Sequence, residues 1–343
     1  MKNKRRGLFW PALGALIVMA VLLRLLSGTA FFVGLARALG PEGEPVRLSA
    51  EAGAALPEPS AAAAEPHLPA RESWLSGESA LPPGRTVLPE AYLPAAGQEA
   101  PPAEPLLRVN NATALQPDLQ ALLAEGWDSR LSRDAPQILI LHSHGCEAYA
   151  PTPEDPYEES DPSRTLDKAH SVIRVGDALA EVLEARGFRV IHDREAYDAQ
   201  GYSGAYERSR AAAERWLEEN PTLRVVIDLH RDALGGYATS WENPAGEHSA
   251  QVMLLLSTGE NGLYHPHWEE NLKLGLALQQ EMETSCPGLA RPLYLSGARY
   301  NQHLSPGFFI LEVGSDANTL QEAITAVTAF AGCAAGVLEE YLS

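Results

Sequence analysis

Short apolar runs alternate with stretches of helical periodicity in the C-terminal part of the chain. A short run with only apolar side chains is typical of a strand that is buried on both faces of a sheet. Apolar residues that recur every three or four positions are typical of a helix with one buried face. This β-α-β-α-β order predicts an α/β fold with a mostly parallel, mixed sheet flanked by helices. The predicted strands are residues 138–141, 188–191, 224–229, 251–256 and 308–313, and the predicted helices are residues 171–186, 208–220, 268–282 and 320–342.

Residues 1–40 begin with basic side chains, which precede an uncharged apolar run from residue 7 to residue 23. Such a segment is compatible with a cleaved signal peptide or with a retained membrane anchor. We expect a single-pass anchor because no clean cleavage site follows the first apolar block. The basic end then stays in the cytoplasm, and the rest of the chain lies on the outer side of the cell membrane.

Residues 41–105 have the composition of a linker and contain 13 of the chain's 26 prolines. A segment rich in Pro, Ala and Glu cannot bury enough apolar area to offset the entropy lost on ordering, so we expect an extended spacer. Apolar periodicity returns in residues 106–136, where we expect a helix that leads into the folded domain. That domain is predicted to cover residues 137–343.

Charge and cysteine content exclude several classes of function. The formal net charge is -19, and so acidic a surface repels phosphate backbones, which makes nucleic acid an unsuitable partner. The three cysteines, Cys146, Cys286 and Cys333, are too few for a disulfide scaffold and have no CxxC spacing. A metal ion would therefore rely mainly on histidine and carboxylate ligands.

Polar residues gather at the carboxyl ends of three predicted strands, where open α/β sheets place their functional sites. The first strand runs into His144 and Glu147, the third runs into His230, and the last contains Glu312. A catalytic zinc ion takes three ligands of these types and leaves a fourth position for water. His144, Glu147 and His230 are the predicted ligands, and Glu312 is the predicted acid-base group.

Other polar residues near these strand ends each have a functional and a structural interpretation. Arg231 follows a predicted ligand and either contacts the substrate and its oxyanion or forms a salt bridge with a neighbouring carboxylate. Asn301 and Gln302 lie in a predicted loop, where they either bind substrate amides or support a turn. Cys146 is expected to pack beneath the first loop, with a role as thiolate ligand or nucleophile as the alternative.

Several stretches of this domain carry a family resemblance. In order, ILILHSHGCEAY, VVIDLHRDA and YNQHLSPGFFILEVGSDANTLQEA resemble the stage II sporulation protein P family of endospore-forming Firmicutes. That family is similar to zinc-dependent N-acetylmuramoyl-L-alanine amidases, whose fold is a mixed sheet flanked by helices. The resemblance implies that the chain removes stem peptides from peptidoglycan during engulfment in sporulation. It also implies two partners, a lytic transglycosylase and a membrane protein that recruits both enzymes.

The family's motifs can be placed on this sequence residue by residue. Its first histidine motif falls on His142 and His144, its next glutamate on Glu147, its second zinc histidine on His230 and its catalytic glutamate on Glu312. His144 is preferred as a ligand because it precedes a glycine, as in the GHGG loop of the wider amidase group, and His142 is the alternative.

Two further questions stay open at the level of sequence. The wider amidases place their ligand glutamate at the start of the first long helix, where this chain has Asp167, so Asp167 is the alternative carboxylate ligand. The same residues are also compatible with a zinc endopeptidase or carboxypeptidase that cuts within the stem. A cell-wall binding scaffold without turnover is the alternative outside the enzyme class, although such a protein has no need of a free Glu312.

Overall fold

The computed structural model describes residues 86–87 and 107–343. The predicted anchor lies outside these residues, and so does nearly all of the predicted linker. Two residues from the linker form strand β1 (Thr86–Val87), which pairs in parallel with β6 (Tyr237–Ala238).

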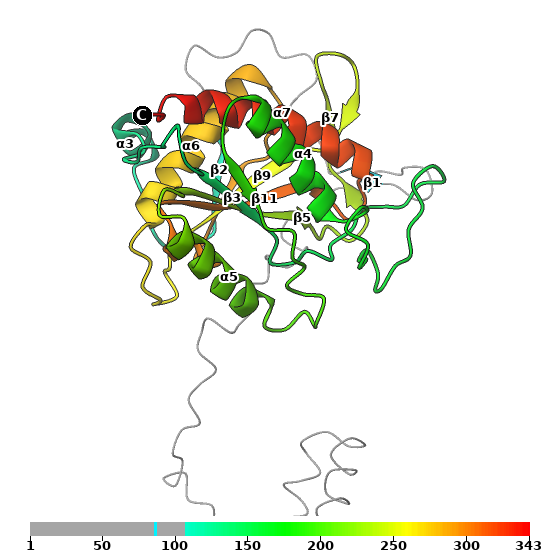
Figure 1. The fold of residues 1–343 in the computed structure, drawn as a ribbon. Helices are drawn as coiled ribbons and strands as arrows, with labels where there is room; N and C mark the ends of the chain where they lie inside the picture. Colours follow the sequence, from blue (N-terminus) through cyan, green and yellow to red (C-terminus); the bar gives the residue numbers. More distant parts are fainter. Residues whose placement is uncertain (1–85, 88–106) are drawn as a thin grey trace, which may run out of the picture. The chain divides into compact units, whose positions relative to one another are not determined.

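A seven-stranded sheet forms the centre of the described domain (Figure 1). Its strand order is β2-β10-β9-β11-β5-β3-β4. The first three strands are parallel to one another, and so are the last four, but β9 and β11 pair in the antiparallel sense. The prediction of a mostly parallel, mixed sheet is confirmed. The strands are β2 (Val109–Asn111), β3 (Ile138–Leu141), β4 (Val190–His192), β5 (Val225–Asp232), β9 (Val252–Ser257), β10 (Leu293–Ser296) and β11 (Gly307–Ser315).

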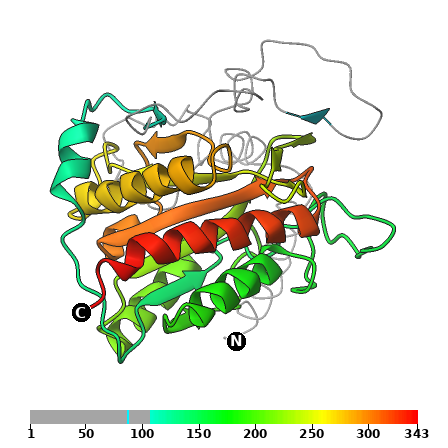
Figure 2. The same cartoon turned by 90° about the horizontal axis from the view of Figure 1, so that it is seen from above.

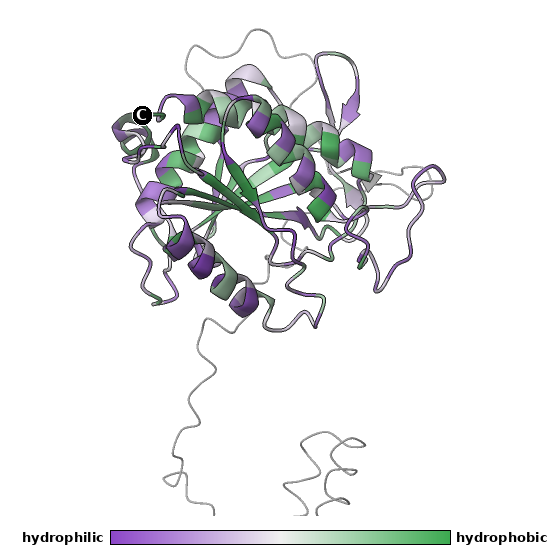
Figure 3. Ribbon diagram, viewed as in Figure 1, coloured by the Kyte–Doolittle hydropathy of each residue, from purple (hydrophilic) through white to green (hydrophobic). Residues whose placement is uncertain are grey.

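Helices cover the two faces of the sheet unequally. Helices α4 (Val172–Ala185), α6 (Trp268–Ser285) and α7 (Leu320–Glu339) lie side by side on one face, whereas α5 (Ala205–Glu219) lies on the other (Figures 1 and 2). The short helix α3 (Leu119–Glu125) packs against α6. Many residues of α5 are hydrophilic, whereas the residues of the central strands are mainly hydrophobic (Figure 3).

Local sequence signals set the helix boundaries. The hydroxyl of Ser171 accepts a hydrogen bond from the Ile173 amide at the start of α4 (3.2 Å), and Gly187 takes a left-handed conformation just after that helix (φ 91°). Helix α7 begins with a capping box, in which the Thr319 side chain accepts from the Glu322 amide and the Glu322 carboxylate accepts from the Thr319 amide.

Alternate residues of each strand point to opposite faces of the sheet. In β11, Leu311 and Val313 belong to the large core beneath α4, α6 and α7, whereas Phe308 packs with the smaller cluster beneath α5. In β5, Ile227 faces the large core and Val226 faces α5. The face that carries α5 therefore also receives the polar residues at the carboxyl ends of β5 and β11.

The region before the predicted domain contributes to the sheet. The predicted lead-in helix at residues 106–136 is a strand, β2, followed by the helix α3. Strand β2 is an edge strand that pairs with β10, a second strand that the hydropathy pattern did not predict. Two further short strands, β7 (Trp241–Glu242) and β8 (His248–Ser249), form a separate hairpin.

Helix α7 is long and apolar enough to cross a membrane by length and composition. Half of its most apolar window is buried within the protein, however, and the helix packs against α4 and α6. In this fold α7 therefore serves as a core helix of the domain.

Candidate metal centre

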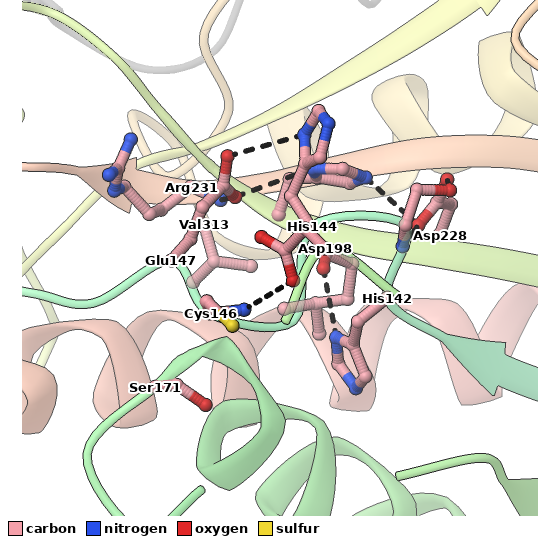
Figure 4. A network of polar contacts seen from close by, with 12 residues as sticks. His142, His144, Cys146, Glu147, Ser171, Asp198, Asp228, Arg231 and Val313 are labelled. Atoms are coloured by element: carbon pink, nitrogen blue, oxygen red, sulfur yellow. Dashed lines mark hydrogen bonds and ion pairs between the residues drawn. The ribbon is translucent and has the colours of Figure 1, made fainter. Parts of the chain in front are cut away.

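Three predicted ligands come together at the carboxyl end of β3 and β5 (Figure 4). The side chains of His144, Glu147 and His230 are buried, and each offers a donor atom within 4.8 Å of the other two. Glu147 lies between the histidines, with Oε1 3.6 Å from Nδ1 of His144 and Oε2 3.3 Å from Nδ1 of His230. Zinc bonds of about 2.0–2.2 Å in a tetrahedral site require comparable donor separations.

A tight turn after β3 brings two of these side chains together. The amide of Glu147 donates to the carbonyl of His144 (3.2 Å), which closes the turn. Gly145 lies inside it, and a Cβ at this position would come within 2.7 Å of the Cα of Ala196. The turn therefore needs glycine because the backbone of a neighbouring segment packs directly against it.

His230 is held from behind by an aspartate in the same strand. Asp228 Oδ1 lies 2.9 Å from Nε2 of His230, and residues two apart in a strand point to the same face. Asp228 is fully buried and also accepts hydrogen bonds from the amide and hydroxyl of Ser143 (2.8 and 2.6 Å). This arrangement fixes the ring so that Nδ1 faces Glu147, as carboxylates do behind many metal-binding histidines.

The charges of the cluster favour a bound cation. Burial alone would raise the pKa of Glu147, but His230 and Arg231 hold it well below its usual range. Burial alone would lower the pKa of His230, but Asp228 and Glu147 raise it well above its ordinary value. Two buried carboxylates thus surround one imidazole and favour positive charge at its position. A metal ion bound by two imidazoles and a carboxylate satisfies this demand, so the residues fit a zinc ion.

Glu312 lies beside this cluster on the neighbouring strand. It is the β11 partner of His230 in the sheet, and its Oε2 is buried with no hydrogen-bond partner among the described residues. Burial raises the pKa of Glu312 to about 8. The register of β11 shifts just after it, and Gly314 there has φ of 66°. The bulge interrupts the pairing of β11 with β5 just beyond the carboxylate, and the pairing resumes at Ser315 and Asp232.

The Arg231 guanidinium is directed away from His144 (Figure 4). Its guanidinium donates to the carbonyls of Ala148 (3.1 Å) and Ser163 (2.9 Å), and its amide donates to Oε2 of Glu147 (3.2 Å). The described residues show no salt bridge from Arg231 to Asp232 or Glu312, the two neighbouring carboxylates, and Asp232 pairs instead with Arg291 at 2.8 Å. Arg231 therefore holds the segment after the ligand turn in place.

The two alternative ligands lie outside the cluster. Both ring nitrogens of His142 are engaged, with Nδ1 2.9 Å from the carbonyl of Leu229 and Nε2 2.8 Å from Nε2 of His192. Asp167 is exposed and contacts Nδ1 of His170 at 3.0 Å. The geometry thus favours His144 over His142, and Glu147 over Asp167.

The two predicted substrate-binding residues have structural contacts. Gln302 is fully buried, and its amide joins the backbone of Leu255 and Ser257 (3.0 and 2.9 Å). Asn301 takes a left-handed conformation (φ 59°), and its amide donates to the carbonyl of Tyr206 (2.8 Å). These contacts tie the loop before β11 to β9 and α5, so neither amide is directed at the metal ligands.

An aromatic ring and its partners complete the wall around His144. The Tyr202 ring stacks on the imidazole of His144, with centroids 4.4 Å apart, and Arg164 lies over the Tyr202 ring at 5.1 Å. Arg164 also pairs with Asp198, whose other oxygen accepts from the amide of Cys146 (3.0 Å). The thiol of Cys146 packs against Ile173 and Ala196, in agreement with its expected packing role.

Sequence reasoning did not assign roles to Asp228, Tyr202 or Asp198. Only Asp228 had a usable signal, because the D-x-H spacing in a strand places both side chains on one face. Tyr202 and Asp198 lie far along the chain from the turn that they support, and no local pattern marks them.

Comparisons with known proteins show which family this sequence resembles. The model of the family described as stage II sporulation protein P (SpoIIP) matches residues 95–335. Stage II sporulation protein P of Bacillus subtilis (strain 168) is 28% identical over 209 residues, which cover 58% of this chain and 50% of that protein. The match thus spans half the length of that relative.

The solved structures that are similar to this chain have low sequence identity to it. The N-acetylmuramoyl-L-alanine amidase from Clostridium difficile 630 has a TM-score of 0.38 and 14% identity, covering 61% of this chain and 97% of that one. The CwlD amidase from Clostridioides difficile, solved with the GerS lipoprotein, has a TM-score of 0.37 and 13% identity, covering 60% and 98%. With a family match that extends over more than half of its sequence, this chain belongs to the stage II sporulation protein P family.

Proposed function

We propose that this chain is a zinc-dependent peptidoglycan hydrolase that cleaves the amide bond between N-acetylmuramic acid and the stem peptide during sporulation. The observation that carries the proposal is the arrangement of the buried side chains. His144, Glu147 and His230 offer donor atoms that lie within 4.8 Å of one another, and Glu312 lies beside them with an unpartnered carboxylate oxygen. A protein that only binds the cell wall has no use for that second carboxylate.

Each residue has a separate role in this proposal. His144, Glu147 and His230 would hold the zinc ion, and Asp228 orients His230. When bound, zinc supplies a positive charge that polarises the scissile carbonyl and acidifies the attacking water. Glu312 accepts a proton from that water and passes it to the leaving amine of the stem peptide. Arg231 keeps Glu147 and the following segment in place rather than touching the substrate.

Glu312 needs a nearby positive charge to act as a base at neutral pH. Its pKa of about 8 means that the carboxyl is mostly protonated when no cation is present. Positive charge held by the neighbouring ligands lowers this pKa and frees the carboxylate. Binding of the cation and readiness of the base are therefore linked in this site.

The proposed setting follows from family membership and from the N-terminal sequence. We propose that residues 1–40 anchor the chain and that residues 41–105 hold the hydrolase domain away from the membrane, on its outer side. A lytic transglycosylase and a membrane recruiter are the proposed partners. Protease added to intact protoplasts should then remove the domain, whereas complete protection would contradict this topology.

The decisive test of the reaction is the mass of its products. Purified peptidoglycan treated with the full-length chain should yield intact stem peptides and glycan with free lactyl groups. Shortened or uncrosslinked stems would instead identify an endopeptidase or carboxypeptidase. Absence of any product, with peptidoglycan still bound, would identify a scaffold.

The metal requires its own test with a matched histidine. Elemental analysis should find one zinc ion per parent chain and none in His230→Ala. His248→Ala is the control, because His248 is exposed on β8 and lies outside the cluster. Full zinc occupancy in His230→Ala would remove that residue from the site.

A further inference from the structure

Two of the three cysteines meet on the face of the sheet opposite the metal centre. Sγ of Cys286 lies 3.7 Å from Sγ of Cys333. Cys286 is the capping residue directly after α6, and Cys333 is buried in α7 against the large core. No other cysteine pair exists in the chain, because Cys146 packs near the ligand turn. The contact between two thiols of neighbouring helices is not required by the proposed reaction.

We propose that Cys286 and Cys333 are an intramolecular disulfide site, which joins the end of α6 to α7. The sulfurs must approach from contact distance to about 2.05 Å. Cys286 can supply this movement because its backbone has already left the helix (φ -135°, ψ 63°).

Cys286 and Cys333 differ in solvent exposure, and this difference sets the order of the two steps of disulfide formation. Cys286 is partly exposed, so its thiolate attacks the disulfide of an external thiol-disulfide oxidant and forms a mixed disulfide. The sulfur of Cys333 then attacks Cys286 and releases the second thiol of the oxidant. Two cysteine thiols lose two electrons and two protons in total, and the oxidant's disulfide is reduced to two thiols.

The second step should depend on pH. Burial raises the pKa of the Cys333 thiol well above its ordinary value. Closure of the mixed disulfide should therefore be slower than its formation and should accelerate as the pH rises. If both cysteines were exposed, formation and closure of the mixed disulfide would not differ in rate in this way.

The position of the cross-link predicts an effect on stability without an effect on turnover. The closed loop runs from α6 through β10 and β11 to α7, so it restricts the unfolded chain. The cross-linked helices cover the face of the sheet that does not carry His144 or Glu312. The three cysteines of the chain are too few for a disulfide scaffold but sufficient for one intramolecular disulfide.

The test uses the purified full-length chain and oxidised glutathione. Thiols are counted after denaturation, and digested peptides are weighed. The parent should fall from three free thiols to one and yield a peptide pair linked through Cys286 and Cys333. Cys146→Ser should still form the link and keep no free thiol. Oxidation should raise the Tm by roughly 5–10 °C and leave the rate of peptidoglycan digestion unchanged.

Two variants keep the outcome clear if one of them folds poorly. Cys286→Ser changes the partly exposed partner, and Cys333→Ala changes the buried partner to a small apolar residue; neither should gain Tm on oxidation. Three free thiols in the folded, oxidised parent would overturn the proposal. A link through Cys146, or one between two chains, would also overturn it. None of these outcomes depends on whether the chain hydrolyses peptidoglycan.

Discussion

The two faces of the central sheet are made from the same strands but have opposite characters. One face is covered by three helices and carries the large apolar core, while the other is covered in part by α5 and carries the candidate metal ligands. Adjacent residues show the change most clearly, since Leu311 belongs to the large core and Glu312 lies beside His230. Because side chains alternate along a strand, residues of the large core and residues of the candidate site follow one another in a single segment of chain.

The polar face is costly to maintain. Asp228, His230 and Glu312 are all buried, and burial of such groups without full compensation opposes folding. The apolar face supplies the compensating free energy, because its side chains remove a large apolar area from water. The unpartnered oxygen of Glu312 costs stability, and the proposed role of this carboxylate as acid-base group gives a reason for that cost.

The largest effect is expected at Glu312, on the polar face of the sheet. Glu312→Gln preserves shape and hydrogen bonding but cannot accept a proton, so the rate of peptidoglycan digestion should fall by about 100-fold or more. Zinc content and peptidoglycan binding should stay at parent levels, as measured by elemental analysis and cosedimentation. Loss of zinc would instead make Glu312 a ligand, and near-parent activity would refute the proposed mechanism.

Its neighbour Leu311 is the matched control on the other face. Leu311→Ala should lower the free energy of unfolding by about 2–5 kcal/mol, because it leaves a cavity in the large core. The remaining folded protein should turn over at a rate close to the parent's. Equal effects of both substitutions on turnover would show that the two faces are not functionally separate.

A smaller effect is expected at Asp228, which supports a ligand without being one. Asp228→Asn should weaken zinc binding by about 10–100-fold, since it removes the carboxylate that orients His230. Competition with a chelator measures this change. The control is Asp193→Asn, a buried aspartate bonded to Tyr197 and Trp216, which should lose stability but keep its zinc affinity. Equal affinities of Asp228→Asn and the parent would argue against a positioning role.

The smallest effect concerns a pair of buried histidines on the face that carries the large core. His142 and His192 contact each other beside Gly176, where a Cβ would come within 2.8 Å of both rings. Burial lowers the pKa of His192 from 6.5 to about 4 and that of His142 from 6.5 to about 3. The unfolded chain therefore takes up protons first, and the folded state loses stability as the pH falls below about 6.5.

Urea denaturation in the presence of a chelator tests this linkage. Acidification from pH 7 to pH 5 should cost the parent about 2 kcal/mol more than it costs His192→Asn. The difference between the two proteins is needed because Glu312, with its raised pKa, acts with the opposite sign over the same window. The same pH dependence in both would mean that the pair does not titrate as described.

Sequence patterns predicted the central elements well because those elements have strong periodicity. The helices α4, α6 and α7 and the strands β3, β5, β9 and β11 begin and end within a few residues of their predicted bounds. The edge strand β2 was missed because three partly buried residues leave no periodic pattern, and β10 is also short. Pairing between strands that are far apart in sequence has no local signature.

The site was predictable in its residue types but not in its contacts. Chemistry and spacing selected His144, Glu147, His230 and Glu312, because such residues at strand ends are seldom there for packing alone. The burial of Gln302 was not predictable, since its partners in β9 lie far from it in sequence. The direction of the Arg231 guanidinium likewise depended on a carbonyl in a distant loop.

Strand β11 is near the C-terminal end of the sequence but at the centre of the sheet, between β9 and β5. The two parallel blocks of the sheet meet only through this strand, so neither block can join the other until residues 307–315 have left the ribosome. Contacts of such long range also make folding slow. Because β11 also sets Glu312 beside His230, the candidate site forms only when this strand takes its place in the sheet.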